Sequence, residues 1–173
     1  MHISVPVEID EKMFLSFAHF ETYRRQKRWK GPLLFGAILI ASALICLLGP
    51  ARRGSVLLGC VLIGVAVLLP AGYFLSYELS LKKQSRAMKL NKPVKAYTVN
   101  MDENHVHVTY AEKSGKTENY RWEKLYGAFE KPDVIYLYIT RARALILPLD
   151  KAEPDREGLI ALIRGKVQNY KKL

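Results

Sequence analysis

The chain has 173 residues, is half hydrophobic and carries a formal net charge of +11, with 27 basic against 16 acidic residues. This length suits one modest domain with additional segments. The positive surplus lies in residues 23–30 and 81–95, on either side of an apolar region, while the chain from Tyr97 onward is nearly neutral. Charge placed there indicates contact with a membrane surface, and it argues against a nucleic-acid-binding domain.

Residues 1–31 predict an amino-terminal arm made of a strand and an amphipathic helix. Ile3–Ile9 alternates and is β-branched, and Pro6 restricts the strand to an edge or to the start of pairing. Asp10 is expected to cap the helix that follows. The apolar stripe of that helix comprises Met13, Phe14, Phe17 and Phe20. The stripe is expected to pack against the protein's own domain, with a partner or the bilayer surface as the alternative, and the helix is expected to continue through residues 21–30.

Residues 32–77 predict a transmembrane hairpin of two helices. Residues 32–48 and 55–77 contain no charged side chain. At 1.5 Å per residue they span roughly 25 and 35 Å, against a hydrocarbon core of about 30 Å. Because neither run contains an ionisable group, the hairpin is expected to be an anchor rather than an ion pathway, with a pore built by several copies as the alternative.

The packing of the hairpin is predicted from its small residues. Ala37 and Ala41 are expected to face Cys60 and Gly64, which would let the two helices approach closely. Pro70 is either the site of a kink or simply tolerated. The two cysteines, Cys46 and Cys60, are expected to remain free thiols that pack in the apolar region, with a disulfide between them as the alternative.

The orientation of the hairpin follows from its charges. Eleven basic residues lie within 24–30 and 82–95, whereas the turn at Gly49–Gly54 carries only Arg52 and Arg53. The positive-inside rule therefore predicts a multi-pass protein of the cytoplasmic membrane with both termini in the cytoplasm. Residues 78–94 form a basic juxtamembrane linker. The candidate contacts to anionic lipid headgroups are Arg24, Arg25, Lys27, Arg28, Lys82, Lys83 and Arg86.

Residues 95–173 predict a small cytoplasmic domain. Alternating apolar positions give six strands, with turns at 102–104 and 113–116 among the connections. The expected strands are 97–101, 105–110, one that ends at Trp122, 125–130, 134–140 and 143–150. Pro154 then starts a helix. Its buried stripe comprises Leu159, Ile160, Leu162, Ile163, Val167 and Tyr170.

This order of antiparallel strands and one carboxy-terminal helix is that of a pleckstrin-homology-like (PH-like) barrel, which has seven strands, and Ile3–Ile9 is the candidate for the seventh. The chain resembles the YcxB-like family of bacterial membrane proteins. The resemblance rests on Trp122, Glu130, Tyr136–Tyr138 and Pro148. Leu149 departs from the family pattern, which usually has a basic residue there.

The resemblance implies a membrane-anchored, PH-like cytoplasmic domain and brings no established activity or site. Trp122 and Pro148 are expected to be structural. The predicted fold class is therefore an α+β membrane protein, in which a transmembrane helical hairpin is joined to a small antiparallel PH-like β-barrel or sheet with a carboxy-terminal helix.

Few residues favour chemistry. His105 and His107 lie on one strand face near Asp102, but no further ligand is identifiable, so a solvated strand face is expected and no metal site. No nucleophile elbow, P-loop or dinucleotide fingerprint is present. We therefore expect no catalytic residue, no cofactor and no enzyme. The acidic turn of Asp102 and Glu103 also argues against inositol-lipid binding there.

These patterns favour a non-enzymatic, membrane-anchored interaction or regulatory module. The alternative is a membrane-protection protein, for example one that gives immunity to a membrane-active peptide, or an accessory subunit of an export assembly. The expected partners are the lipid bilayer with its anionic headgroups and an unknown protein, which includes a second copy of the chain. No nucleic acid is expected.

Overall fold

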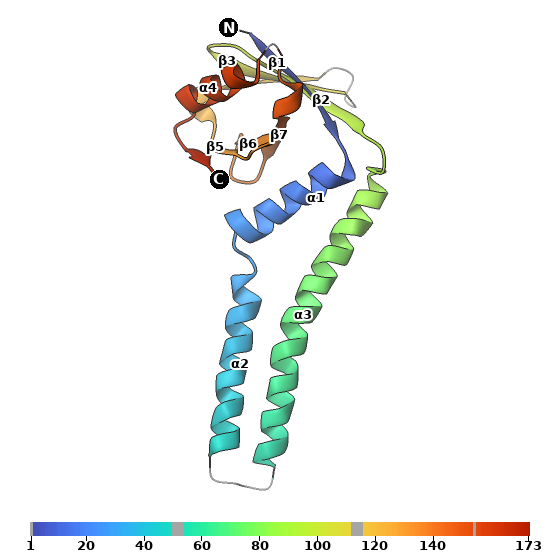
Figure 1. Cartoon of the computed structure of the whole chain (residues 1–173), viewed down its shortest axis with the longest axis vertical. Coiled ribbons are helices and arrows are strands. Elements are labelled where there is room, and N and C mark those ends of the chain that lie inside the picture. Colours follow the sequence, from blue (N-terminus) through green and yellow to red (C-terminus); the bar gives the residue numbers. More distant parts are fainter. Residues whose placement is uncertain (1, 50–53, 112–115, 154) are drawn as a thin grey trace. The chain divides into compact units, whose positions relative to one another are not determined.

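The computed structural model describes residues 2–49, 54–111, 116–153 and 155–173. The chain forms two compact units of an α+β protein (Figure 1). The sheet unit comprises Met1–Asp10 and Lys92–Leu173, and the helical unit comprises Glu11–Asn91. The amino-terminal strand therefore belongs with the carboxy-terminal part of the chain, although the whole helical unit separates them in sequence.

The first sheet of the sheet unit is antiparallel and has the order β1-β2-β3-β4. Its strands are β1 (Ile3–Ile9), β2 (Val94–Met101), β3 (His105–Tyr110) and β4 (Thr117–Arg121). The predicted strand Ile3–Ile9 is confirmed, and it pairs with β2 from Ile3 opposite Met101 to Ile9 opposite Val94. Because Ile3, Val5 and Val7 alternate with polar residues or Pro6, one face of β1 is buried.

The second sheet has the order β7-β6-β5-β8. Its strands are β5 (Gly127–Glu130), β6 (Val134–Tyr138), β7 (Ala144–Pro148) and β8 (Tyr170–Lys172). A short 3-10 helix, η3 (Leu149–Lys151), and the helix α4 (Arg156–Lys166) precede β8. Within the described residues the two sheets share no strand pair, so the predicted barrel is not closed.

Strand β8 corrects the expected count of seven strands and the expected all-antiparallel sheet. It pairs parallel to β5, with Tyr170 opposite Ala128. Gly127 permits this approach, since a Cβ atom there would lie 2.9 Å from the carbonyl oxygen of Asn169. The placement of Tyr170 in the helix stripe was therefore wrong, because α4 ends at Lys166 and Val167 already has an extended backbone.

Two further boundaries differ from the predictions. The third strand after the hairpin, β4, ends at Arg121, and Trp122 begins the 3-10 helix η2 (Trp122–Lys124) instead of ending the strand. Helix α4 begins at Arg156 after Asp155, whose carboxylate accepts hydrogen bonds from the amides of Glu157 and Gly158 at 3.1 and 2.9 Å. The predicted start at Pro154 and most of the predicted turn at 113–116 lie outside the described residues.

The core of the sheet unit lies between its two sheets and α4. Its fully buried members are Ile3, Val5, Val99, Met101, Val106, Val108, Ala128, Ile135, Leu137, Leu147, Leu159 and Ile163. The hydroxyl of Tyr97 on β2 also joins the sheets, because it donates to the Ile146 carbonyl at 3.3 Å and accepts from the Ile146 amide at 2.8 Å. Burial raises the pKa of Tyr97, so this hydroxyl stays protonated.

The described residues of the helical unit form four helical segments. They are α1 (Glu11–His19), the π-helix η1 (Phe20–Arg25), α2 (Lys30–Leu48) and α3 (Ser55–Ala87). The expected continuous helix from the arm into the first apolar run was wrong, because residues 26–29 are not helical and Lys27 has φ 51°. Helix α3 extends ten residues past the apolar run that ends at Tyr77, through the first part of the basic linker.

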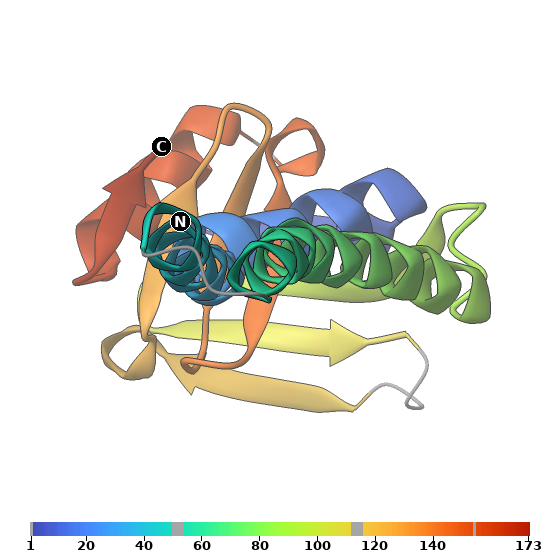
Figure 2. The ribbon, with the colours of Figure 1, turned by 90° about the horizontal axis from the view of Figure 1, so that it is seen from below.

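The helices α2 and α3 lie side by side (Figures 1 and 2). The buried small residues are Gly36 and Ala43 on α2 and Gly59, Ala66 and Pro70 on α3. A Cβ atom at Gly36 would lie 3.1 Å from the Ala66 carbonyl oxygen, and one at Gly59 would lie 2.7 Å from Leu47 Cγ. Pro70 has no backbone N–H, so the Ala66 carbonyl lacks the hydrogen bond that it would accept in a regular helix.

The expected helix contact through Ala37, Ala41 and Cys60 was wrong, because all three are exposed. Small residues occur on several faces of each helix, so spacing alone did not select the contacting face. Both cysteines are free.

Candidate functional site

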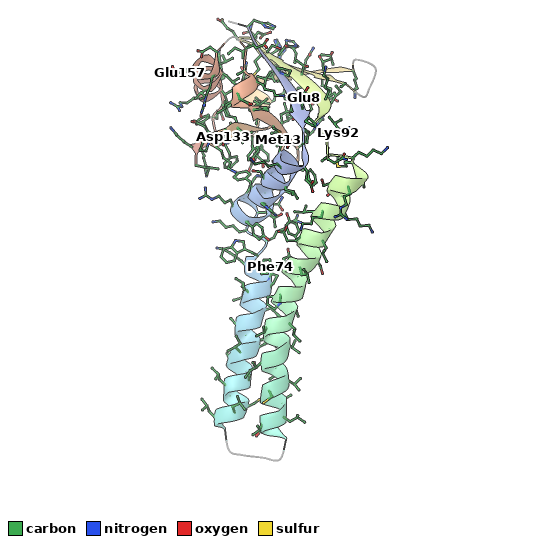
Figure 3. All side chains as sticks on the ribbon, turned by 45° about the vertical axis from the view of Figure 1, so that its right-hand side comes forward. Glu8, Met13, Phe74, Lys92, Asp133 and Glu157 are labelled. Atoms are coloured by element: carbon green, nitrogen blue, oxygen red, sulfur yellow. The ribbon has the colours of Figure 1, made fainter. Side chains whose placement is uncertain are left out.

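The helical unit presents apolar side chains outward along α2 and the first part of α3. Ile45, Leu57 and Leu68 are 74%, 71% and 72% exposed. The side chains along this stretch are almost all carbon (Figure 3). By length and composition both helices could cross a membrane. Only 11% of the most apolar 18-residue stretch of each helix is buried.

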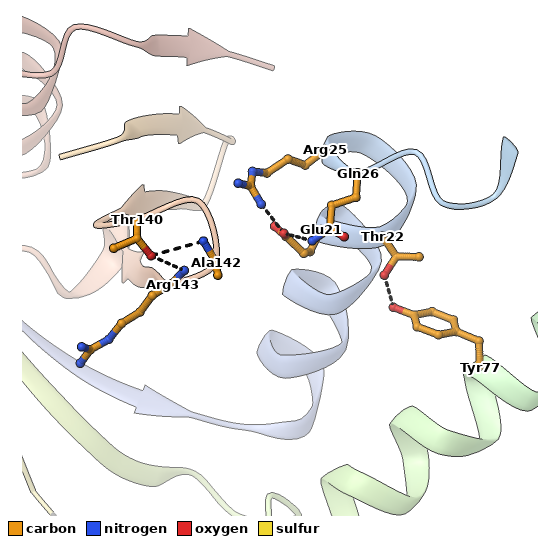
Figure 4. A network of polar contacts seen from close by, with 8 residues as sticks. All are labelled: Glu21, Thr22, Arg25, Gln26, Tyr77, Thr140, Ala142 and Arg143. Carbon is orange, nitrogen blue, oxygen red and sulfur yellow. Dashed lines mark hydrogen bonds and ion pairs between the residues drawn. The ribbon is translucent and has the colours of Figure 1, made fainter. Parts of the chain in front are cut away.

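Aromatic and polar contacts join the arm to α3 at one end of this apolar surface. Tyr77 on α3 donates its hydroxyl hydrogen to the Ala18 carbonyl at 3.0 Å and accepts from the Thr22 hydroxyl at 2.7 Å (Figure 4). The ring of Tyr23 stacks on Phe74 with centroids 6.2 Å apart, and Trp29 donates its indole N–H to the Tyr23 carbonyl at 3.1 Å. This mixture of apolar rings and polar tips is typical of side chains at a membrane–water interface.

The first basic segment, residues 24–28, follows directly on these contacts. Arg25 is half-buried and forms an ion pair with Glu21 (Figure 4). Arg24, Lys27 and Arg28 are exposed, and none of them pairs with a carboxylate of the described chain. The Arg28 amide donates to the Thr22 carbonyl at 3.1 Å, so the non-helical link is fixed to the π-helix before it. Three of the four predicted lipid contacts in this segment are therefore available to a ligand.

The second basic segment lies on the last three turns of α3. Leu81 and Ser85, one turn apart, are buried, while Lys82, Lys83 and Arg86 are exposed. At 1.5 Å per residue, Lys82 lies roughly 8 Å and Arg86 roughly 14 Å beyond Tyr77 along the helix. Lys82 and Lys83 are therefore nearer to the apolar surface than Arg86. Both predicted basic segments belong to the same helical unit.

In the sheet unit the turn between β2 and β3 gathers a polar cluster. Asp102 Oδ1 accepts hydrogen bonds from the amides of Asn104 and His105 at 2.7 and 2.6 Å. Asp102 Oδ2 lies 3.0 Å from His107 Nε2, and His107 Nδ1 lies 2.7 Å from Asn119 Oδ1. The backbone amides, followed by His107, lower the pKa of Asp102 to about 2, while the hydrogen bonds to Asn119 and then Asp102 raise the pKa of His107.

The structure brings the ligand atoms of Asp102, His105 and His107 within 4.8 Å of one another. These are the two histidines and the nearby aspartate for which a solvated strand face was expected. All three residues are partly exposed, and His107 is hydrogen-bonded on both ring nitrogens.

Trp122 and Pro148, the family-motif residues, both lie in the interior. Trp122 is 4% exposed, and its indole N–H donates to the Asp102 carbonyl at 2.9 Å. Pro148 is buried at the end of β7 opposite Val134. Leu149, which stands where the family usually has a basic residue, is 2% exposed within the core.

Two carboxylates connect distant segments, and no structural role was expected for either, although Glu130 is one of the residues that carry the family resemblance. Glu130 on β5 is 7% exposed and accepts hydrogen bonds from Tyr170 on β8 and from Arg164 on α4 at 3.2 Å. The Tyr170 hydroxyl, followed by Arg164, lowers the pKa of Glu130. Arg164 and Tyr170 are 34 and 40 residues away from Glu130 in the sequence, so no local pattern could have identified them as its partners.

Glu118 on β4 is the second such carboxylate. It accepts from Arg143 at 2.8 Å and from the Tyr120 hydroxyl, and its other oxygen pairs with Lys116 at 3.1 Å. These donors, with Tyr120 first, lower the pKa of Glu118 to about 2. The Thr140 hydroxyl oxygen accepts from the amides of Ala142 and Arg143 at 3.3 and 3.1 Å and so fixes the loop that carries Arg143 (Figure 4).

Comparison with known families gives one match. A family model described as YcxB-like protein matches residues 102–162. These residues of the chain are YcxB-like. The YcxB-like segment runs from the β2–β3 turn into α4 and contains Trp122, Glu130 and Pro148, whereas the arm, the hairpin and β8 lie outside it. The searches of curated proteins and of solved structures gave no match.

Proposed function

We propose that the protein is a non-enzymatic, membrane-anchored interaction or regulatory module. In this proposal the hairpin spans the cytoplasmic membrane, and the sheet unit is a PH-like domain on the cytoplasmic side. The observation that carries the proposal lies within the helical unit, where an outward-facing apolar surface ends in aromatic residues followed by exposed cations that pair with no described carboxylate. The YcxB-like segment lies in the sheet unit and adds no activity to this proposal.

The dimensions of the hairpin support membrane insertion. Helix α2 has 19 residues, which is roughly 28 Å, and Ser55–Tyr77 of α3 is roughly 35 Å, against a hydrocarbon core of about 30 Å. A helix satisfies its own backbone hydrogen bonds and needs no water there. The Ser42 hydroxyl donates to the Ile38 carbonyl of the same helix at 3.0 Å, so this polar group is also satisfied. We therefore assign the hairpin as an anchor.

The distribution of charge supports the orientation. Eleven basic residues flank the two apolar runs, and two, Arg52 and Arg53, lie between them in the part of the turn outside the described residues. Because cytoplasmic flanks are enriched in Lys and Arg, both termini are assigned to the cytoplasm. The exposed cations of the helical unit then face the leaflet that carries anionic lipids.

We assign contact with anionic headgroups to both basic segments, with unequal contributions. A cation near an anionic surface contributes about 1 kcal/mol, and the effect falls off within a Debye length of about 8 Å. Arg86 lies farther along α3 from the apolar surface, so it is expected to contribute less than Lys82, Lys83 and Arg28. Arg25 contributes less because Glu21 already neutralises it.

Binding of phosphatidylglycerol and phosphatidylcholine to the purified full-length protein, measured by native mass spectrometry, tests this assignment. We expect a preference for phosphatidylglycerol that falls about fivefold for each cation removed. The informative variants are Lys82→Gln/Lys83→Gln and Arg24→Gln/Arg28→Gln. The control is Lys124→Gln/Lys171→Gln, which removes the same charge from exposed positions of the sheet unit.

Equal binding of the two lipids by the wild type contradicts the proposal, and so does an equal loss of preference in the control variant. If Arg86→Gln reduces the preference for phosphatidylglycerol more than Lys82→Gln does, the assigned order of contributions is contradicted. In each comparison the net charge of the two variants is the same, so a non-specific effect of charge is separated from the effect of position.

A further inference from the structure

The β2–β3 turn places three side chains of metal-ligand type in one cluster. Asp102 follows the last residue of β2, and His105 and His107 occupy positions i and i+2 of β3, so the two imidazoles share one face of the sheet. Their ring centroids are 5.8 Å apart. In the part of the chain that the structure describes, this is the only group of three histidine, cysteine or acidic residues with ligand atoms close enough to share an ion.

Outer hydrogen bonds orient two of the three side chains. The amides of Asn104 and His105 hold Asp102 Oδ1 and leave Oδ2 directed at His107. Asn119 Oδ1 holds His107 Nδ1 and leaves Nε2 directed at Asp102. Metal-binding histidines have this arrangement, in which the second ring nitrogen is fixed by a hydrogen-bond acceptor.

If the proton of a neutral His107 ring is on Nδ1, the contact between His107 and Asp102 requires a cation between them. When Nδ1–H donates to Asn119 Oδ1, the lone pair of a neutral Nε2 faces the carboxylate oxygen at 3.0 Å. Two acceptors at this distance repel each other unless a proton or a metal ion lies between them. The neighbouring imidazole of His105 supplies a third donor atom that a shared proton does not need but a metal ion would use.

We propose that Asp102, His105 and His107 form a binding site for a transition-metal cation of the Zn²⁺ class. Two imidazole nitrogens with one carboxylate oxygen suit Zn²⁺, Ni²⁺ or Co²⁺, whereas Ca²⁺ and Mg²⁺ prefer oxygen ligands throughout. Metal–ligand bonds of about 2.0–2.1 Å place the ligand atoms of a tetrahedral site roughly 3.4 Å apart. The ligand atoms, all within 4.8 Å, reach this spacing by small side-chain rotations.

A solvent-open hollow lies beside the site. His105 borders a hollow of about 420 Å³ that Trp122 also lines. The charged residues around this hollow are Glu103, Arg121, Glu123 and Lys166. The two carboxylates balance the two basic side chains, so a metal ion in the site faces no net positive charge from this hollow. Three protein ligands with a water in the fourth position is a common arrangement for zinc.

Calorimetric titration of the metal-free full-length protein with ZnCl₂ in detergent, at pH 7.5 and in a non-chelating buffer, tests the site. We expect one Zn²⁺ per chain, and Co²⁺ in its place should give the visible absorption bands of a tetrahedral complex. His105→Asn, His107→Asn and Asp102→Asn should each abolish the binding. Asp102→Asn is informative because asparagine can keep the turn's hydrogen bond to the backbone.

Two further variants separate a built site from an incidental one. Asn119→Ala leaves all three ligands in place and removes only the outer hydrogen bond, so it should weaken Zn²⁺ binding about 10–100-fold. His19→Asn removes a histidine of the helical unit and should change nothing. Far-UV circular dichroism verifies that each variant is folded. If a ligand variant does not fold, Asn119→Ala still tests the site, because it should bind more weakly while its Co²⁺ complex keeps the spectrum of the wild type.

The proposal is overturned if the wild type binds no Zn²⁺ and gives no tetrahedral Co²⁺ spectrum. It is also overturned if the ligand variants bind as the wild type does, or if His19→Asn removes the binding, since the ion is then held elsewhere. In the first case the Asp102–His107 contact is a proton-mediated ion pair alone. The site lies in the sheet unit, so these outcomes are independent of lipid binding by the helical unit.

Discussion

In the sheet unit Val99, Val106 and Val108 are fully buried, whereas in the helical unit Leu57 and Leu68 are 71% and 72% exposed. Both units are rich in branched apolar residues, but their patterns differ. The strands alternate apolar with polar residues and so define an inner face, while the two long helices are apolar on all sides. The sheet unit therefore buries its apolar side chains within itself, whereas the hairpin leaves most of them exposed, as the proposed membrane anchor requires.

The largest effect is expected at Trp122, the bulkiest side chain of the sheet unit's interior. Trp122→Ala removes most of the indole volume and its hydrogen bond to the Asp102 carbonyl, so it should lower the free energy of unfolding by about 3–5 kcal/mol. Hydrogen exchange of the β2 and β3 amides in increasing denaturant measures the loss in the full-length protein.

Trp122→Phe is the matched variant, because it keeps most of the ring volume and loses the hydrogen bond. It should destabilise less than the alanine variant. An alanine variant with the wild-type midpoint contradicts the structural role and makes Trp122 a candidate for partner binding.

A pair of apolar truncations compares the two units directly. Ile3→Ala, at a fully buried position of β1, should cost about 2–5 kcal/mol in the sheet unit. Leu57→Ala, at a 71% exposed position of α3, should change the stability of the detergent-solubilised hairpin by less than about 0.5 kcal/mol. Similar losses at both positions, measured by denaturation and by steric trapping respectively, would show that the hairpin has an interior of its own.

The contact between α2 and α3 is tested by two glycines. Gly36→Val forces a side chain against the Ala66 carbonyl and Pro70, so it should weaken the hairpin by about 1–3 kcal/mol. Gly64→Ala, where an added Cβ atom meets nothing within 4 Å, should be neutral or stabilising by up to about 1 kcal/mol. Steric trapping in bicelles measures both, and a reversed order contradicts the helix face seen in the structure.

The smallest effect is a dependence on pH that involves the sheet unit alone. Glu118 has its pKa lowered to about 2, so its ion pairs stabilise the fold above the unfolded pKa of about 4.3 and are lost as the pH falls toward 2. The difference in stability between the wild type and Glu118→Gln should therefore shrink between pH 5 and pH 2. A difference that is constant across this range contradicts the assigned role of the carboxylate.

Features set by local pattern could be predicted from the sequence. Ile3–Ile9 was found from its alternation, and the two apolar runs were found from their length. Features set by distant contacts could not be. Strand β8 consists of three residues that pair because Gly127 admits Asn169, and Glu130 is recognisable as a link only when Arg164 and Tyr170 are in place.

The candidate sites divide in the same way. The basic residues near the apolar runs are visible in the sequence, and so is the i,i+4 spacing of Glu21 and Arg25. The π-helix of Phe20–Arg25 and the break in the helix at Lys27 have no such signal. The two histidines of β3 were visible, while the bond from Asn119 that orients His107 comes from the neighbouring strand register.

Cysteine accessibility in intact cells tests the membrane anchor and its orientation most directly. In a background of Cys46→Ala/Cys60→Ala, single cysteines are introduced as Ser55→Cys, near the turn, and Ser114→Cys, between β3 and β4. The account predicts that a membrane-impermeant maleimide labels Ser55→Cys in intact cells and labels Ser114→Cys only after the membrane is opened. Labelling of Ser114→Cys from outside contradicts the orientation, and labelling of both positions only after lysis contradicts the spanning hairpin.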